Sequence, residues 1–158
     1  MSSFTFLVAD RPLQQVDYSG IVELTVREMK EMYPISETFP EQPWHSMDDD
    51  TRILHAPDQS AFGKLAVSIS ENPPTDLAYY SDKKYIYSIQ GNWGSDFLID
   101  FANYMKTSIH IDDHAQLLLF WAGDGIQQLK EHTVAIDKIE PDYLEMLEHE
   151  RNIRLRLK

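Results

Sequence analysis

Cysteine is absent from this 158-residue chain, and basic residues are scarce in it. Without cysteine the chain forms no disulfide, uses no thiolate nucleophile and holds no zinc through sulfur. The 14 lysines and arginines face 26 aspartates and glutamates, which gives a formal net charge of −12. Non-specific binding to nucleic acid depends on clustered Lys and Arg, so we expect no nucleic-acid partner. The acidic balance is compatible with a basic protein partner.

Long apolar runs and targeting signals are also missing. The longest apolar run covers residues 117–122, far fewer than the roughly 20 residues that a membrane-spanning helix needs. The first residues, Met1-Ser2-Ser3-Phe4, lack the basic stretch and the apolar stretch of a signal peptide. We therefore expect a cytoplasmic protein without a membrane partner.

The sequence contains none of the short motifs that would identify an enzyme or a nucleotide site. Its six glycines are spread out, and Gly123-Asp124-Gly125, which predicts a turn, lacks the spacing of either nucleotide fingerprint. No Gly-x-Ser-x-Gly nucleophile elbow is present, and sequence alone pairs none of the six scattered histidines with a serine. We therefore predict no cofactor and assign no catalytic residue, and whether the protein is an enzyme stays open.

Hydrophobic periodicity and turn residues indicate an α+β fold. Helices are expected at residues 26–33, at 95–107 and after Pro141, although one longer helix beginning at Ile21 competes with a strand there. Strands are expected at residues 3–9, 21–25, 64–70, 76–80, 85–90, 116–121, 133–136 and 151–158, with 76–90 forming a hairpin. This order predicts a single domain over residues 1–158, with a mixed or mostly antiparallel sheet and about three helices.

The apolar positions of these elements predict the core. The residues expected to be buried are Leu65, Val67, Ile69, Phe97, Phe101, Leu118, Phe120 and Leu144. In the C-terminal strand the period of two places Ile153, Leu155 and Leu157 on one face. Arg154, Arg156 and Lys158 then lie on the opposite face, where we expect them to be close to carboxylates.

Two polar clusters resemble metal ligands, but both are better explained as turns. The stretch from His110 to His114, with Asp112 and Asp113 inside it, follows a helix and precedes a strand, where adjacent aspartates are typical of a turn. The run Asp48-Asp49-Asp50 lacks the alternating ligands and the glycine of a calcium loop. We predict no metal site at either cluster.

The segment from Glu31 to Thr51 is the candidate binding site. It contains three prolines, no Lys or Arg, and aromatic residues between its carboxylates. Long irregular segments are often functional, and aromatic anchors inside an acidic rim suit capture of a basic protein. The residues predicted to contact the partner are Glu37, Phe39, Glu41, Trp44, Asp48, Asp49 and Asp50. The alternative is a loop whose aromatic side chains simply attach it to the core.

These observations favour a non-enzymatic interaction protein, of the inhibitor or immunity type, that binds a basic partner. A second hypothesis is a small-molecule enzyme or binding domain whose site is assembled from scattered His, Asp and Tyr side chains. A third is a structural subunit, which would have a large, apolar and self-complementary interface.

Overall fold

The computed structural model describes residues 2–123 and 125–158, so Met1 and Asp124, the middle residue of the predicted 123–125 turn, lie outside the described residues. The chain divides into two compact units. Unit 1 consists of residues 1–18 and 63–158, and unit 2 of residues 19–62. Within the described ranges there are three α-helices and a mostly antiparallel sheet, which confirms the predicted α+β class. One folded domain over the whole chain stays a prediction.

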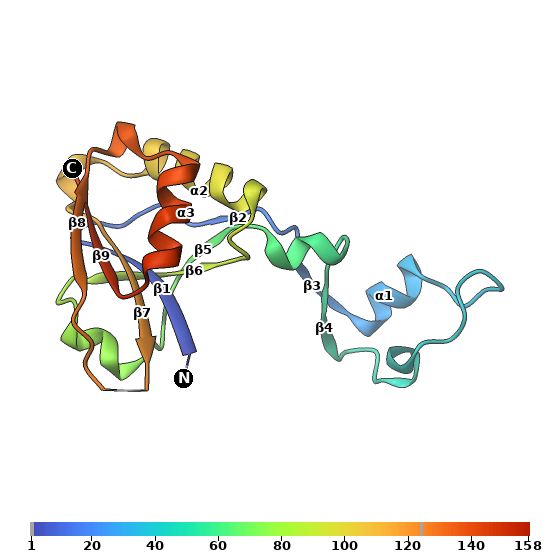
Figure 1. Cartoon of the computed structure of the whole chain (residues 1–158). Coiled ribbons are helices and arrows are strands. Elements are labelled where there is room, and N and C mark those ends of the chain that lie inside the picture. Colours follow the sequence, from blue (N-terminus) through green and yellow to red (C-terminus); the bar gives the residue numbers. More distant parts are fainter. Residues whose placement is uncertain (1, 124) are drawn as a thin grey trace. The chain divides into compact units, whose positions relative to one another are not determined.

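Unit 1 is built on a seven-stranded sheet (Figure 1). Its strands are β1 (Ser2–Ala9), β2 (Val16–Asp17), β5 (Ala66–Ile69), β6 (Tyr85–Gln90), β7 (Gln116–Ala122), β8 (Lys130–Val134) and β9 (Ile153–Leu157). They are ordered β2-β5-β6-β1-β7-β9-β8. Neighbouring strands are antiparallel except β8 and β9, which are parallel. No helix in residues 2–123 or 125–158 has the length and apolar character to cross a membrane.

Each face of this sheet carries its own core, because successive side chains of a strand point to opposite faces. On one face, Leu7, Leu117 and Leu155 pack with residues of α2 (Ser95–Ser108) and α3 (Pro141–Glu150). On the other face, Phe6, Leu118 and Phe120 pack with residues in and just after the 3₁₀ helix η3 (Thr75–Tyr79). The sheet therefore lies between a layer of α-helices and a shorter irregular segment.

The predicted strand at residues 76–80 is wrong, and so is the hairpin built on it. The residues form η3, which Pro74 precedes as N-cap. Leu77 and Tyr80 are three residues apart, and the three-residue turn of a 3₁₀ helix puts them on the same side. Both are buried against Phe120 and its neighbours, so burial of this pair outweighs the extended conformation.

Seven of the eight predicted core residues are buried, and Ile69 is the exception, with 53% of its surface exposed. Leu65, Val67 and Ile69 share one face of the same extended segment, yet only Leu65 and Val67 belong to the core. Ile69 is the last residue of β5, where the strand continues beyond the packed layer. The period of a strand predicts the face of a residue but not how far the covering helices reach.

The C-terminal strand β9 lies inside the sheet, between β7 and β8. Ile153, Leu155 and Leu157 are buried as predicted. On the opposite face Arg154 and Arg156 form ion pairs with Glu131 at 2.8 and 3.2 Å. The parallel strand β8 therefore supplies the expected carboxylate neighbour of the two arginines, whereas Lys158 follows the strand and forms no ion pair with a described residue.

Unit 2 contains a two-stranded sheet of β3 (Val22–Thr25) and β4 (Arg52–His55), and the helix α1 (Val26–Met32). Short 3₁₀ helices occur at η1 (Pro43–Ser46) and η2 (Gln59–Gly63) here, and at η4 (Ile111–Asp113) and η5 (Ile136–Lys138) in unit 1. The competing prediction of one helix from Ile21 is wrong, because Thr25 is extended and caps α1. The irregular segment predicted up to Thr51 contains η1 and leads into β4. The sequence analysis predicted no strand at β4.

Candidate functional site

The predicted binding loop folds around a set of rings in unit 2. We call Tyr33, Phe39, Trp44, His45 and His55 the aromatic–histidine cluster. Tyr33 stacks on Phe39 with ring centroids 5.3 Å apart, and Trp44 stacks on His45 at 3.8 Å. The Tyr33 hydroxyl and His55 Nε2 are hydrogen-bonded at 2.9 Å, which joins the end of α1 to β4.

His45 is the centre of this cluster and is buried. Its Nδ1 accepts a hydrogen bond from the backbone N–H of Gln42 at 2.8 Å, so the proton of a neutral ring is on Nε2. Nε2 then donates to the Tyr33 carbonyl at 3.3 Å. His45 thus ties two distant parts of the loop together through backbone groups. Phe39 and Trp44, the predicted anchors, are half-buried against these rings.

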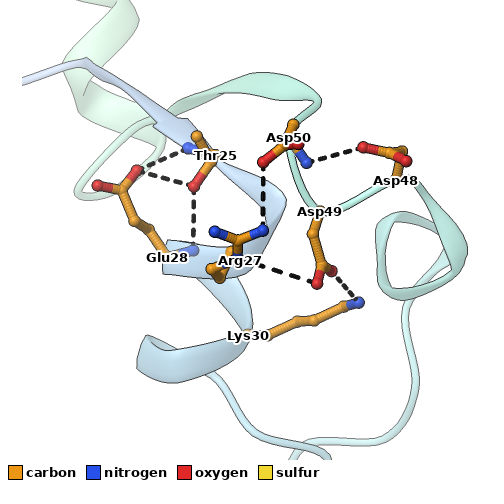
Figure 2. Close-up of polar contacts among 7 residues, drawn as sticks. All are labelled: Thr25, Arg27, Glu28, Lys30, Asp48, Asp49 and Asp50. Carbon is orange, nitrogen blue, oxygen red and sulfur yellow. Dashed lines mark hydrogen bonds and ion pairs between the residues drawn. The ribbon is translucent and has the colours of Figure 1, made fainter.

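The three consecutive aspartates contact α1 or their own turn (Figure 2). Lys30 Nζ lies 2.6 Å from Asp49 Oδ1, and Arg27 Nη2 lies 3.3 Å from Asp50 Oδ1. Asp48 Oδ1 accepts the backbone N–H of Asp50 at 2.9 Å. The helix therefore supplies the cations that the loop lacks, and two of the three carboxylates are paired.

A capping box of Thr25 and Glu28 begins α1 (Figure 2). Glu28 Oε2 accepts the Thr25 backbone N–H at 2.7 Å, and Thr25 Oγ1 accepts the Glu28 backbone N–H at 3.2 Å. The hydrogen bond from the Thr25 backbone, followed by that from its hydroxyl, lowers the pKa of Glu28. The hydrogen bond and charge of Lys30 likewise lower the pKa of Asp49.

Acid should loosen unit 2. Both carboxyls have a folded pKa below the unfolded value, so their stabilisation is complete above the ordinary carboxyl range and is lost as the pH falls below about 4. We expect the protection factors of the Val26 and Arg27 amides, which bond to the Thr51 and Asp49 carbonyls, to fall over this interval. An Asp49→Asn variant, measured by NMR, should lose the part of this change that Asp49 contributes and keep the part that Glu28 contributes. Equal profiles for the two proteins would contradict this account.

Other acidic and apolar side chains of residues 31–47 are exposed on the surface of unit 2. Glu31, Glu37 and Glu41 are exposed and form no ion pair with any residue in the described ranges. Met32, Ile35 and Met47 have 52%, 58% and 46% of their surface exposed. We call residues 31–47 the acidic–apolar segment.

Sequence analysis identified Glu37 and Glu41 but not the three apolar residues, since apolar side chains are expected inside. Met29, Met32 and Tyr33 have the spacing of the inner side of the helix predicted at residues 26–33, but 52% of the surface of Met32 is exposed. The short length of the helix was one signal that Met32 would be exposed. In its seven residues Val26 and Met29 occupy the buried positions, which leaves little core for Met32.

The histidine cluster at residues 110–114 is dispersed in the structure. His114 Nδ1 faces Asp10 at 3.3 Å, whereas Asp112 lies 3.9 Å from Arg11. Asp113 is buried and accepts the His110 backbone N–H at 2.8 Å, which closes the predicted turn. Among residues 2–123 and 125–158 no group of three His, Asp or Glu side chains is arranged to hold a metal ion.

Comparison with protein-family models, with curated proteins and with solved structures finds no match to this chain. Function is therefore argued from the chemistry of particular surfaces rather than from the fold.

Proposed function

We propose that this protein binds a basic protein partner through the acidic–apolar segment and acts as an interaction protein or inhibitor. The observation that supports this most directly is the uneven pairing of charge in unit 2. Residues 19–62 contain nine acidic and three basic residues, and Arg27, Lys30 and Arg52 are each ion-paired. Glu31, Glu37 and Glu41 therefore present negative charge that no described residue neutralises.

The acidic–apolar segment offers apolar contact area as well as negative charge. Carboxylates attract a basic partner over a distance and raise the association rate, but exposed ion pairs contribute little affinity each. Burial of Met32, Ile35 and Met47 would supply the apolar part of the interface. Methionine suits this position because its flexible thioether adapts to the shape of a partner.

The ordered loop would lower the entropy cost of binding. In our proposal His45, Phe39 and Trp44 hold the loop in one conformation, and a preordered surface loses less freedom when a partner docks. Asp49 and Asp50 hold the same loop on α1. Of the acidic residues predicted from sequence, we thus assign Glu37 and Glu41 to direct contact.

Charge-neutral variants test the proposal. The full-length chain, a Glu31→Gln/Glu37→Gln/Glu41→Gln variant and a control are used to capture proteins from an extract of the source cells. The control, Glu71→Gln/Asp82→Asn/Glu145→Gln, removes the same number of exposed charges from unit 1. We expect the unaltered chain and the control to retain the same basic protein, and the unit 2 variant to lose at least about tenfold in affinity, the equivalent of about 1.4 kcal/mol.

Binding should also weaken as salt is raised, because the contacts lie on an exposed surface. The proposal is wrong if no basic protein is retained, or if the unit 2 variant and the control retain it equally.

A further inference from the structure

Residues of unit 1 line a hollow of about 480 Å³. Thr5, Ile89 and Leu119 line it from the helix-covered face of the sheet. Trp93, just before α2, and Glu148, near the end of α3, line it from the two helices. The volume is within the range of about 300–1,000 Å³ that is typical of small-molecule sites.

Two indole rings, those of Trp93 and Trp121, line this hollow. Trp93 lies 5.3 Å from Phe97 and 5.9 Å from Phe101, both buried residues of α2. Trp121 lies on the same face of β7 as Leu119. The guanidinium of Arg151 lies over the Trp121 ring, 5.1 Å from its centroid. The hollow therefore combines flat apolar walls with one cation in a defined place.

Arg151 differs from the other arginines of the chain. All six lie in the described ranges, and the other five form ion pairs, whereas Arg151 forms none with a described residue. Its guanidinium carbon lies over the Trp121 ring instead, 5.1 Å from the ring centroid. A guanidinium in a cation–π contact keeps its N–H donors, whose fork matches the two oxygens of a carboxylate.

The backbone of Arg151 is also unfavourable for any residue except glycine. It caps α3 with φ 58° and ψ 166°, and its N–H donates to the Leu147 carbonyl at 3.3 Å. Non-glycine residues in this region are strained, and such strain concentrates at functional sites. Helix capping alone explains neither an arginine in this strained conformation nor the lack of an ion pair between its guanidinium and the part of the chain that the structure describes.

We infer that the hollow binds a small molecule in which a carboxylate is attached to a flat apolar ring. The carboxylate would accept hydrogen bonds from Arg151, and the ring would pack against Trp93, Ile89 and Leu119. A singly charged carboxylate suits the site better than phosphate, because Glu148 also lines the hollow and the chain carries a net charge of −12. The inference does not depend on the function proposed for unit 2.

Phenylacetate is the minimal probe, with phenylacetamide as its uncharged counterpart. In NMR titrations of the full chain we expect phenylacetate to shift the indole N–H signals of Trp93 and Trp121, with a Kd of about 1–10 mM for so small a ligand. Phenylacetamide should bind at least about tenfold more weakly, because it lacks the charge-assisted hydrogen bonds. Absence of these shifts overturns the inference. Tighter binding of inorganic phosphate or of glucose assigns the hollow to another ligand class and overturns it as well.

Substitution at residue 151 completes the test. Arg151→Gly removes the guanidinium where glycine is the favoured residue, so phenylacetate affinity should fall at least about tenfold without a lower melting temperature. Arg156→Gln, which removes a cation that pairs with Glu131, is the matched control and should bind normally. If Arg151→Gly lowers the melting temperature, Arg151→Gln replaces it in the comparison. Unchanged affinity in the folded variant rules out a carboxylate at Arg151.

Discussion

Removal of residues 152–158 should prevent unit 1 from folding. The deletion takes away β9, the partner of both β7 and β8, together with Ile153, Leu155 and Leu157 from the core. Burial of each such side chain contributes about 1.5–3 kcal/mol, so three of them approach the total stability of a typical domain, about 5–15 kcal/mol. The loss of backbone pairing for β8 adds to this effect.

Circular dichroism and a thermal scan of the truncated chain measure the result. Lys158→Ala is the control, since this side chain is exposed and the substitution keeps the backbone hydrogen bonds of Lys158 to Val134 and Ile136. We expect the control to melt cooperatively and the truncated chain to aggregate or to show no transition. A soluble truncated chain with an unchanged melting temperature would contradict the assignment of β9 as a structural strand.

Phe101→Ala should destabilise the protein by about 3–5 kcal/mol. The side chain is fully buried in the helix-covered core, and its ring lies 5.5 Å from Phe97 and 5.9 Å from Trp93. Alanine removes the apolar surface and leaves a cavity that the packed sheet and helices fill only in part. The loss should therefore be at the upper end for a single core substitution.

Denaturant titration measures this loss, with Asn103→Ala as the control on an exposed position of the same helix. The control should change the free energy of unfolding by less than about 0.5 kcal/mol. A loss below about 1 kcal/mol for Phe101→Ala would show that the ring is not a core element.

Periodicity predicted the parts of the fold in which local pattern and burial agree. The apolar run of β7, the inner face of α2 and the alternation of β9 all identify buried residues correctly. Residues 76–80 show the opposite case, because Leu77 and Tyr80 would point to opposite faces of a strand, whereas the 3₁₀ turn buries both in the cluster that contains Phe120. The conformation of this short segment is therefore determined by its tertiary contact with Phe120 and not by its local sequence pattern.

Pairings between distant segments could not be predicted from the sequence. The loop at residues 48–50 is acidic in sequence, but Lys30 and Arg27 pair with Asp49 and Asp50 from a helix about twenty residues earlier. Arg151 is one more basic residue in the C-terminal strand when only its sequence is considered. In the structure its guanidinium lies over Trp121 and pairs with no carboxylate of residues 2–123 or 125–158, and this depends on the placement of two elements about thirty residues apart. No local pattern contains that information.

The central claim is that the acidic–apolar segment of unit 2 contacts a basic partner. The most direct measurement is amide hydrogen exchange of the full chain, free and in complex with the basic protein that it captures. We predict slower exchange in residues 31–47 of the complex, with no change around Arg151 and Trp121. Protection confined to unit 1, with residues 31–47 exchanging as in the free chain, would contradict the claim.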